Sequence, residues 1–379
     1  MQYIGRAIEE SFLKKVRPGK VTLLLGARRI GKTSFIQHIV KKMKEPMLML
    51  NGEDMDTIQM LSHRSIENYK RVAGKNKLII IDEAQKIPEV GQVLKLMIDE
   101  LPDLKIIATG SSMFDLGNKL GEPLTGRNIT FLMFPFAQME LSKEETIIQI
   151  KGRLEERLIY GSYPELWQYQ GMNEKAAYLK ELINAYLFKD IIAYEGIRNS
   201  SKMIDLLRLV AFQIGNDVSI QEIAKQLGIS RATVDKYLDL LTKVFILHKV
   251  SAYSKNLRSE ISKSNRWYFY DNGVRNALIS NFNSLNLRDD VGALWENYVI
   301  SERLKFQNYT GMISNNYFWR TYQQQEVDWV EERAGNLFAY EMKWGTKKKV
   351  GAPSAWKKAY PKSEFMLVNP DNYLDWIGG

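Results

Sequence analysis

The stretch LLLGARRIGKTSFIQHIV, residues 23–40, decides the fold of the N-terminal part of this chain. An aliphatic run precedes a glycine-containing loop, and an amphipathic helical pattern follows it. The loop fits the pattern G-x-x-x-x-G-K-[ST], in which backbone amides turn toward phosphate groups at a helix N-terminus. A chance glycine loop would lack these flanking elements. The context therefore predicts a phosphate-binding P-loop between a strand and a helix.

The whole loop is the predicted nucleotide-binding segment. Its residues are Gly26, Ala27, Arg28, Arg29, Ile30, Gly31, Lys32, Thr33 and Ser34. We expect Lys32 to reach the terminal phosphates and to take part in catalysis, and the Thr33 hydroxyl to ligate magnesium. The expected cofactors are therefore ATP and Mg²⁺.

A second motif, LIIIDEAQ at residues 78–85, has the pattern of a buried strand that ends in acidic residues. Stability does not explain two adjacent carboxylates, Asp82 and Glu83, at such a strand end. We expect Asp82 to hold magnesium and Glu83 to orient or deprotonate the attacking water during phosphoryl transfer. The alternative is that both acids cap the next helix.

Two further residues are candidates for the same reaction. Thr109 begins the segment TGSS at residues 109–112, where a hydroxyl is suited to sensing the γ-phosphate. Arg127, in the segment LTGRNITF, is suited to stabilising the charge of the transition state. A surface or ion-pairing arginine explains Arg127 equally well.

Five aliphatic runs between residues 20 and 135 predict strands: VTLLL, PMLML, LIIID, LKIIAT and ITFLMF. They alternate with helical patterns, which indicates a parallel α/β sheet. Residues 140–215 lose the strand signal and show helical spacing. This second region is expected to form a helical lid or connector.

The composition limits which binding partners and which cellular location we expect. The chain has 379 residues, no cysteine and only three histidines, so disulfides and thiolate metal sites are excluded and any metal should be a hard ion held by carboxylates. No apolar run is long enough to span a bilayer and no secretory signal is seen, so we expect a cytoplasmic protein with no membrane partner. The net charge of +9 favours DNA or another nucleic acid as a partner. Oligomerisation stays open.

The segment VSIQEIAKQLGISRATVDKYLDLL, residues 218–241, is typical of a helix-turn-helix. Ser219 and Glu222 form a capping-box pattern, Gly228 supplies the turn, and Ser230 is placed to cap a second helix. The exposed side of that second helix carries Arg231, Thr233, Asp235 and Lys236. These side chains are few and include an acid, so the helix fits DNA contact and packing against protein equally well.

The segments GARRIGKT, IIIDEAQKIP, ATGSS, LTGR and YGSYPE together resemble a family of bacterial and archaeal AAA-type ATPases. The resemblance covers nearly the whole chain. It implies an α/β P-loop NTPase core of the additional-strand, catalytic-glutamate type, then a winged helix and a C-terminal restriction-endonuclease-like domain. We therefore expect an AAA-type ATPase core at 1–140, a helical lid or connector at 141–202, a winged helix-turn-helix at 203–265 and a nuclease-like domain at 266–379.

Residues 326–344, EVDWVEERAGNLFAYEMKW, are expected to form a hairpin around a turn at residues 333–336. Such a hairpin pairs residues whose numbers sum to 669, so that Asp328 lies opposite Glu341. The other face of the hairpin is predicted to be apolar core, with Val327, Trp329, Phe338, Tyr340, Met342 and Trp344. Two facing carboxylates repel each other unless a proton or a cation intervenes, and a divalent metal would remove the repulsion.

This D…ExK arrangement, with Glu296 on a preceding helical segment, is similar to the PD-(D/E)XK nuclease core. The resemblance implies that Asp328 and Glu341 bind magnesium and that Glu296 assists the metal site. It also implies that Lys343 orients water or stabilises the phosphorane charge. Val327 stands where that motif is expected to carry proline.

The C-terminal segment also has a non-catalytic interpretation. The hairpin could be solvated, with an ion pair between Glu326 and Lys343, and the run Lys347-Lys348-Lys349 fits a phosphate-backbone contact or a solvated turn. The sequence therefore supports two hypotheses. One is an ATP-regulated, metal-dependent nuclease, and the other is a nucleotide-switched binding or signalling protein whose C-terminal domain recognises without cutting.

Overall fold

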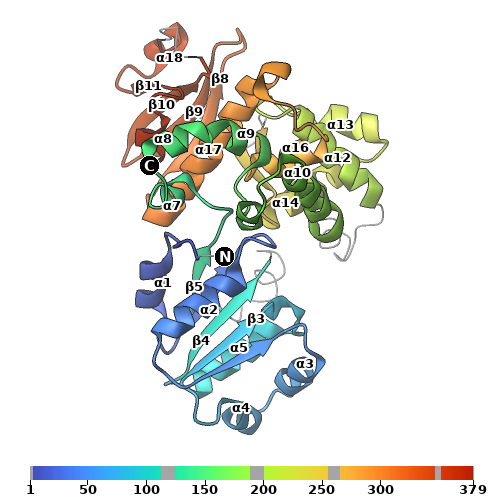
Figure 1. Cartoon of the computed structure of the whole chain (residues 1–379), viewed down its shortest axis with the longest axis vertical. Coiled ribbons are helices and arrows are strands. Elements are labelled where there is room, and N and C mark those ends of the chain that lie inside the picture. The colour runs from blue at the N-terminus through green and yellow to red at the C-terminus, as the bar shows by residue number, and fades with distance from the viewer. Residues whose placement is uncertain (1–2, 112–123, 188–199, 255–264, 346–350, 379) are drawn as a thin grey trace. The chain divides into compact units, whose positions relative to one another are not determined.

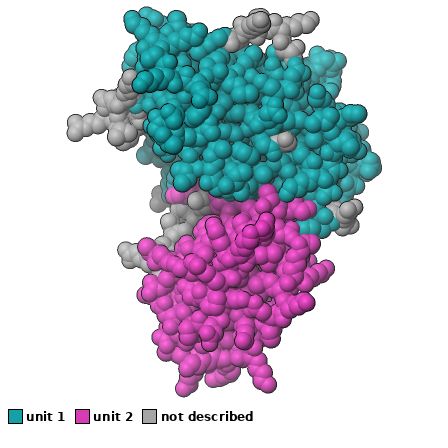
Figure 2. All heavy atoms as spheres, turned by 90° about the vertical axis from the view of Figure 1, so that its left-hand side faces the viewer, with its two compact units in different colours: residues 1–4, 135–242, 246–379 teal, residues 5–134, 243–245 magenta. Residues whose placement is uncertain are grey.

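The chain folds into two compact units, which Figure 2 colours separately. Unit 2 contains residues 5–134 and 243–245, and unit 1 contains residues 1–4, 135–242 and 246–379. The structure, a computed structural model, describes residues 3–111, 124–187, 200–254, 265–345 and 351–378. Within these residues, no helix combines the length and the apolar character that crossing a membrane requires.

Unit 2 is built on a five-stranded parallel sheet in the order β2-β3-β4-β1-β5. Its strands are β1 (Val21–Leu25), β2 (Met47–Asn51), β3 (Leu78–Asp82), β4 (Lys105–Gly110) and β5 (Asn128–Leu132). All five strands predicted from the aliphatic runs are confirmed. Because β4 lies between β1 and β3, one additional strand separates the strand before the P-loop from the strand that ends in Asp82.

The helices of unit 2 hold the P-loop at the carboxyl end of β1. They are α1 (Glu9–Lys15), α2 (Lys32–Lys42), α3 (Met55–Ser62), α4 (Ile66–Ala73) and α5 (Val90–Glu100), with a 3-10 turn η1 (Ala84–Lys86). Phe12 of α1 meets Phe35 of α2 edge-on at 5.1 Å between ring centroids, and Phe131 of β5 at 5.0 Å. This shared aromatic core fixes α2 against the sheet, and Figure 1 shows α1 and α2 beside β5.

Unit 1 contains a six-stranded mixed sheet in the order β11-β10-β9-β8-β6-β7. Its strands are β6 (Leu247–Ala252), β7 (Asn265–Phe269), β8 (Asn315–Arg320), β9 (Glu326–Arg333), β10 (Asn336–Met342) and β11 (Glu364–Val368). The strands β8, β9 and β10 form an antiparallel meander, and β11 pairs in parallel with β10. The long helix α17 (Val291–Thr310) packs against β7 and β10 (Figure 1).

The remaining helices of unit 1 are short and lie mostly between residues 138 and 278. They are α7 (Gln138–Leu141), α8 (Ile147–Gly152), α9 (Leu154–Tyr160), η2 (Pro164–Gln168), α10 (Met172–Glu181), η3 (Leu182–Leu187), α12 (Ser200–Phe212), α13 (Ile220–Leu227), α14 (Arg231–Lys243), α16 (Asn272–Leu278), η4 (Leu285–Leu287), α18 (Ser354–Ala359) and α19 (Tyr373–Ile377). The helical character predicted for residues 140–215 is confirmed over the described part of that range.

The predicted segments at 141–202, 203–265 and 266–379 lie in one compact unit, apart from residues 243–245. The boundary proposed at 265 falls inside a pair of strands, since β7 begins at Asn265 and is antiparallel to β6. The strand β6 also pairs with β8, so the hairpin after the helix-turn-helix continues the sheet that carries the D…ExK residues. The strands β6 and β7, which follow the helix-turn-helix, therefore share one sheet with the strands of the C-terminal segment.

Candidate functional site

The P-loop has a backbone that only glycine allows at two positions. A Cβ on Gly26 would lie 2.1 Å from the carbonyl oxygen of Met133, which leaves no room for a side chain. Gly31 has φ +89° and is the N-cap of α2. Arg29 between them also has a positive φ, of 63°. These three residues curve the loop over the N-terminus of α2.

Lys32 lies in the concave side of this loop. Its side chain is buried, and Nζ donates hydrogen bonds to the carbonyl oxygens of Gly26 and Ala27, each at 2.9 Å. Thr33 and Ser34 are exposed, whereas Ala27 and Ile30 are buried. The predicted loop residues are thus together, and Ala27 and Ile30 offer backbone groups rather than side chains to a ligand.

The two nucleotide motifs meet at Asp82. The Thr33 hydroxyl donates to Asp82 Oδ2 at 2.8 Å, and the Thr109 hydroxyl donates to Asp82 Oδ1. In P-loop NTPases, side chains in the positions of Thr33 and Asp82 hold the magnesium ion, together with phosphate oxygens and water. The sequence predicted both residues of the pair, and the structure brings them into contact.

Thr109 lies in the predicted cluster, but its hydroxyl bonds to the two acidic residues. It is fully buried, and its hydroxyl accepts a hydrogen bond from the backbone N–H of Glu83 at 3.1 Å while donating to Asp82. Its single donor is therefore directed at Asp82 rather than at a γ-phosphate. Thr109 joins the end of β4 to the end of β3 and fixes both acidic residues.

Glu83 immediately precedes the turn η1, and its carboxylate bonds to a side chain of that turn. Its φ is +50°, and its carboxylate accepts a hydrogen bond from Gln85 Nε2 at 2.5 Å. Gln85 also donates to the Ser111 hydroxyl at 3.1 Å. Glu83 makes no side-chain cap to the turn that follows, so the capping alternative for this residue is not supported. Sequence reasoning missed Gln85, although its position two residues after Glu83 in DEAQ was a usable signal.

Arg127 does not belong to the nucleotide site of its own chain. Its carbonyl accepts from the N–H of Val21, so it lies where β1 and β5 begin, whereas the P-loop lies where β1 ends. Its side chain pairs with Asp99 of α5 at 2.9 Å and is partly exposed. The ion-pairing alternative is therefore the one that the structure supports.

The hairpin of β9 and β10 has the predicted register. Asn336 pairs with Arg333 and Tyr340 with Trp329, and both pairs sum to 669. Trp329, Tyr340 and Met342 lie in one apolar cluster with Trp295 of α17. The apolar face was therefore predicted correctly for these residues.

The register of β9 against β8 changes at Asp328. Tyr317 pairs with Val330 and Trp319 with Val327, so two residues of β9 stand opposite one residue of β8. This β-bulge places Val327 in the second cluster, around Trp356, instead of the predicted one. The ion pair of Glu326 with Lys343 that the non-catalytic interpretation offered does not form, because Glu326 pairs with Arg266 at 2.9 Å and Lys343 with Glu341 at 2.7 Å.

Both hairpin carboxylates are buried, so the solvated hairpin is excluded. Asp328 is 4% exposed and Glu341 is 8% exposed. Burial and the charges of Glu296 and Glu341 raise the pKa of Asp328 well above its ordinary value. Asp328 Oδ2 accepts from the N–H of Met342 at 2.8 Å, whereas Glu341 Oε2 has no hydrogen-bond partner among the described residues. A buried carboxylate oxygen without a donor is suited to a cation.

Lys343 and Glu296 complete the predicted set. Burial lowers the pKa of Lys343, but its bond to Glu341 and the charges of Asp328, Glu341 and Glu296 raise it overall. Glu296 on α17 accepts from the Tyr268 hydroxyl at 2.7 Å and lies 3.9 Å from the Arg266 guanidinium. Burial raises the pKa of Glu296, against the opposing effects of Arg266 and Tyr268.

The predicted metal set is nevertheless incomplete as a three-carboxylate site. Across the described ranges, no three Asp, Glu, His or Cys side chains converge closely enough to hold a metal ion. Glu296 is held by Tyr268 and Arg266, which leaves Asp328 and Glu341 as the adjacent pair. Sequence reasoning missed Tyr268 and Arg266, which belong to β7. Lys347-Lys348-Lys349 lies outside the described residues.

Three known protein families match successive parts of the chain. Residues 18–142 match the family described as AAA domain. Residues 151–285 and 291–377 match two domains of unknown function, DUF8612 and DUF4143. Unit 2 has the fold of an AAA-type P-loop ATPase. This fold implies nucleotide binding, typically with Mg²⁺.

Two longer relatives are uncharacterised. The chain is 26% identical to the uncharacterized protein Rv2008c of Mycobacterium tuberculosis over 330 residues, 85% of this chain and 70% of that protein. It is 26% identical to the uncharacterized protein MJ1544 of Methanocaldococcus jannaschii over 346 residues, covering 86% and 75%. The solved Walker-type ATPase PABY2304 of Pyrococcus abyssi aligns with a TM-score of 0.51 and 19% identity, over 73% of this chain and 96% of that one. The structural match shows a shared fold.

The segment 218–241 forms two helices with a turn between them. The Ser219 hydroxyl accepts from the N–H of Glu222 at 3.3 Å, Gly228 ends α13 with φ +64°, and Ser230 caps α14. Ile223 and Leu227 of α13, and Val234, Leu238 and Leu241 of α14, are buried. On the exposed face of α14, Arg231 lies 3.8 Å from Asp235, one turn away. This contact neutralises part of the positive charge of the helix.

Proposed function

We propose that the chain binds ATP with Mg²⁺ in unit 2 and hydrolyses it. The observation that carries this proposal is the 2.8 Å contact between the Thr33 hydroxyl and Asp82, which joins the two nucleotide motifs. When ATP binds, the Lys32 ammonium would donate its hydrogen bonds to phosphate oxygens instead of the carbonyl oxygens of Gly26 and Ala27. Glu83, held by Gln85, would orient or deprotonate the attacking water. Mg²⁺ would supply charge neutralisation at the β- and γ-phosphates.

Two substitutions test the roles separately. Lys32→Ala should sharply weaken ATP binding, because the buried ammonium lies against the loop carbonyls of Gly26 and Ala27, where the phosphates would bind. Glu83→Gln should keep ATP binding while turnover falls by about 10²–10⁴-fold, the range for loss of a general base. Binding is measured by titration with nucleotide, and turnover by phosphate release. Wild-type turnover in Glu83→Gln would show that this assignment is wrong.

We further propose that unit 1 couples nucleotide state to nucleic acid through a winged helix and a PD-(D/E)XK site. Three observations support this. The β6–β7 hairpin follows the helix-turn-helix, as a wing does. The order α17–β8–β9–β10–α18–β11 carries Glu296 on the helix, Asp328 on β9 and Glu341 before Lys343 at the end of β10. Glu341 Oε2 is buried and has no hydrogen-bond partner in the described part of the chain.

In this proposal Asp328 and Glu341 would hold one Mg²⁺ together with water and a phosphate oxygen, since magnesium needs only one or two carboxylates. The metal would polarise the phosphodiester and lower the pKa of a bound water. Lys343 would hold that water or the phosphorane charge. Glu296, with Tyr268 and Arg266, would set the local charge rather than ligate the metal.

The test is thermal stability in magnesium or manganese, without ATP and in a Lys32→Ala background that removes the P-loop contribution. The metal should stabilise the parent chain, and Asp328→Ala should lose that gain. Lys343→Ala should keep metal binding and lose cleavage of DNA or RNA. Metal binding without cleavage in the parent chain would instead favour the alternative, a nucleotide-switched binding or signalling protein. No metal binding and no cleavage would remove the nuclease proposal.

A further inference from the structure

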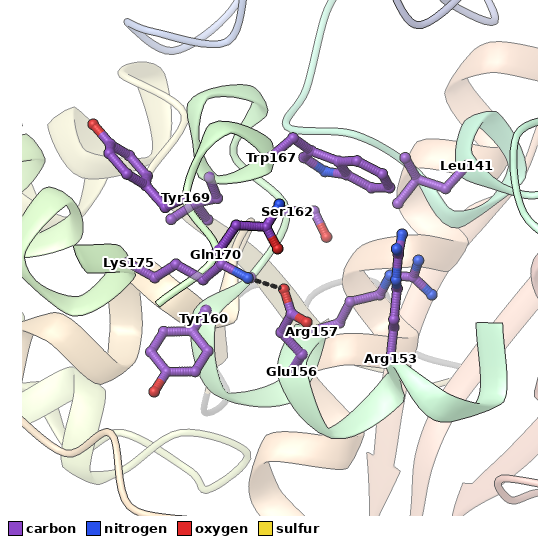
Figure 3. A pocket seen from close by; sticks show the side chains of 12 residues that line it. Leu141, Arg153, Glu156, Arg157, Tyr160, Ser162, Trp167, Tyr169, Gln170 and Lys175 are labelled. Atoms are coloured by element: carbon purple, nitrogen blue, oxygen red, sulfur yellow. Dashed lines mark hydrogen bonds and ion pairs between the residues drawn. The ribbon is translucent and has the colours of Figure 1, made fainter. Parts of the chain in front are cut away.

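Unit 1 contains a cavity that belongs to neither of these sites. Its volume is about 170 Å³, and residues between 141 and 175 line it. Figure 3 shows Lys175, Ser162 and Trp167 around the same opening, with Glu156 and Arg157 beside them. The lining is mostly charged or polar, in contrast to the apolar clusters of the sheet. A cavity of this size holds a molecule about as large as benzene.

The wall of the cavity at Gly161 and Ser162 is rigid. Gly161 has φ +73°, and a Cβ there would lie 2.0 Å from the Asp271 carboxylate. That carboxylate accepts from the N–H of Ser162 at 2.7 Å and from the N–H of Val274 at 3.1 Å. The Ser162 carbonyl accepts from the N–H of Phe136 at 2.9 Å. These bonds hold the start of the segment YGSYPE in one conformation before any ligand binds. A preformed wall of this kind reduces the conformational entropy lost on binding.

The charges around the cavity do not cancel. Arg153, Arg157 and Lys175 line it, and Glu145 behind the wall pairs with both arginines. Glu156 pairs with Lys175. Among the lining side chains themselves, three cations therefore stand beside one carboxylate, Glu156, while Glu145 and Asp271 lie behind the wall.

Two hydrogen-bonding groups at the cavity have capacity for a ligand. The Lys175 side chain is 10% exposed, and among the described residues its three ammonium protons have one partner, Glu156. Ser162 is 5% exposed, and its hydroxyl makes no hydrogen bond within the part of the chain that the structure describes. Nearly buried donors of this kind are costly to leave unused.

We propose that this cavity binds a small organic anion, with an oxyanion head group on a compact flat body. The head group is a carboxylate or a phosphate, bound by the Lys175 ammonium and the Ser162 hydroxyl. Trp167, which stacks with the Arg153 guanidinium at 5.3 Å, offers a flat surface to the body. The site is independent of ATP binding and of phosphodiester chemistry, because it shares no residue with the P-loop or the hairpin.

Isothermal titration of the Lys32→Ala chain with benzoate, phenyl phosphate and benzamidine tests the proposal. The Lys32→Ala background is needed because the P-loop itself binds phosphate. We expect benzoate, phenyl phosphate or both to bind, and benzamidine, a cation of similar size, not to bind. Binding of one anion alone identifies the head group. Failure of both anions to bind at millimolar concentration overturns the proposal, without bearing on ATP hydrolysis or cleavage.

Single substitutions locate the binding. Lys175→Gln and Ser162→Ala should each weaken anion binding by about tenfold, as expected for loss of a hydrogen bond to a charged group. Glu156→Gln should strengthen it, because the competing carboxylate is removed from Lys175. Lys180→Gln is the matched control, since this exposed lysine lies on the same helix α10 and outside the lining. Equal affinity in the parent, Lys175→Gln and Ser162→Ala chains would place the anion elsewhere and overturn the proposal.

Discussion

The Arg266 guanidinium on β7 lies 3.9 Å from the Glu296 carboxylate on α17. The same guanidinium donates to Asp217, in the loop before the helix-turn-helix, at 3.1 Å, and to Glu326 of β9 at 2.9 Å. It stacks over Phe318 and is 2% exposed. One buried cation thus joins the loop before α13 to the candidate nuclease residues.

From this position we predict that Arg266→Met lowers the stability of the folded chain by a large amount. Removing the cation takes away the positive charge beside the buried Glu296 carboxylate, and breaking a buried ion pair typically costs about 3–5 kcal/mol of unfolding free energy. The matched control is Arg320→Met, because Arg320 also bonds Asp217 but is 36% exposed, and should cost under about 1 kcal/mol. Denaturant unfolding measures both. Adding Glu296→Gln to Arg266→Met should recover part of the loss, and equal losses in the two single variants would contradict this account.

Asp328 predicts a pH dependence of stability. Its pKa in the folded chain is raised above the ordinary value of 3.8, so the folded state holds the proton more tightly than the unfolded state. The stabilising contribution is therefore complete below pH 3.8 and is lost as pH rises through the raised pKa. Asp328→Asn mimics the protonated form and can still accept from Met342 N–H. Without metal, we expect the variant to match the parent at low pH and to be more stable at neutral pH.

The difference should be of the order of 1–3 kcal/mol at neutral pH, the usual cost of an unsatisfied buried polar group. Melting temperatures of the two chains across pH 4 to 8, in the presence of a chelator, give the comparison. Parallel curves would mean that Asp328 does not titrate between the two states. Magnesium should reduce the difference in melting temperature between the parent and Asp328→Asn chains, because a cation stabilises the ionised carboxylate of the parent chain.

Local pattern was sufficient to predict much of the fold. The aliphatic runs that became β1, β3 and β4 are buried along most of their length, so consecutive residues alone indicate these strands. The hairpin register followed from side-chain alternation and the turn at residues 333–336, both of which are local. The P-loop pattern likewise fixed Gly26 and Gly31, because their backbone demands are met only by glycine.

The misses depend on contacts between distant segments. The bulge at Asp328 arises from pairing with β8, and Trp356, from α18, packs in one cluster with Val327, Val330 and Ala339 of the hairpin. Arg266 meets Asp217 and Glu296 only because β7 joins the C-terminal sheet. Thr109 was placed in the right cluster, but its partners come from β3. No single-segment pattern encodes such partners.

Thr109→Val tests the bridge between β4 and β3. The substitution keeps the shape and removes the hydroxyl that bonds Asp82 and the N–H of Glu83. We expect ATP turnover to fall while nucleotide binding is kept, with a loss of about 1–3 kcal/mol of stability. Thr22→Val is the matched control, because Thr22 on β1 is also fully buried and its hydroxyl is without a hydrogen-bond partner in the described chain. A similar loss of turnover in both variants would attribute the effect to sheet packing.

Arg127→Ala should leave the nucleotide site intact. Its partner is Asp99, and it lies at the end of the sheet opposite the P-loop. We expect turnover close to that of the parent and a stability change under about 1 kcal/mol, the usual value of a partly exposed ion pair. The assay is phosphate release over a range of protein concentrations. A large loss of turnover that appears only at high concentration would indicate that Arg127 acts on the site of another copy.

The last prediction concerns α14 and duplex DNA. If this helix contacts the phosphate backbone, affinity should fall steeply between low and physiological salt, because bound counterions are released. Lys236→Ala should weaken binding and reduce the slope of log affinity against log salt by about 1. Asp235→Asn should strengthen binding, since it frees Arg231 from an exposed contact of 3.8 Å. The matched control is Asp205→Asn on α12, which frees Arg208 from a similar exposed pair at 3.7 Å.

Fluorescence anisotropy with a labelled duplex measures all three variants. An unchanged affinity in Lys236→Ala and Asp235→Asn at low salt would assign α14 to contacts with protein, because a DNA-facing helix cannot lose or gain a charge without a change in binding.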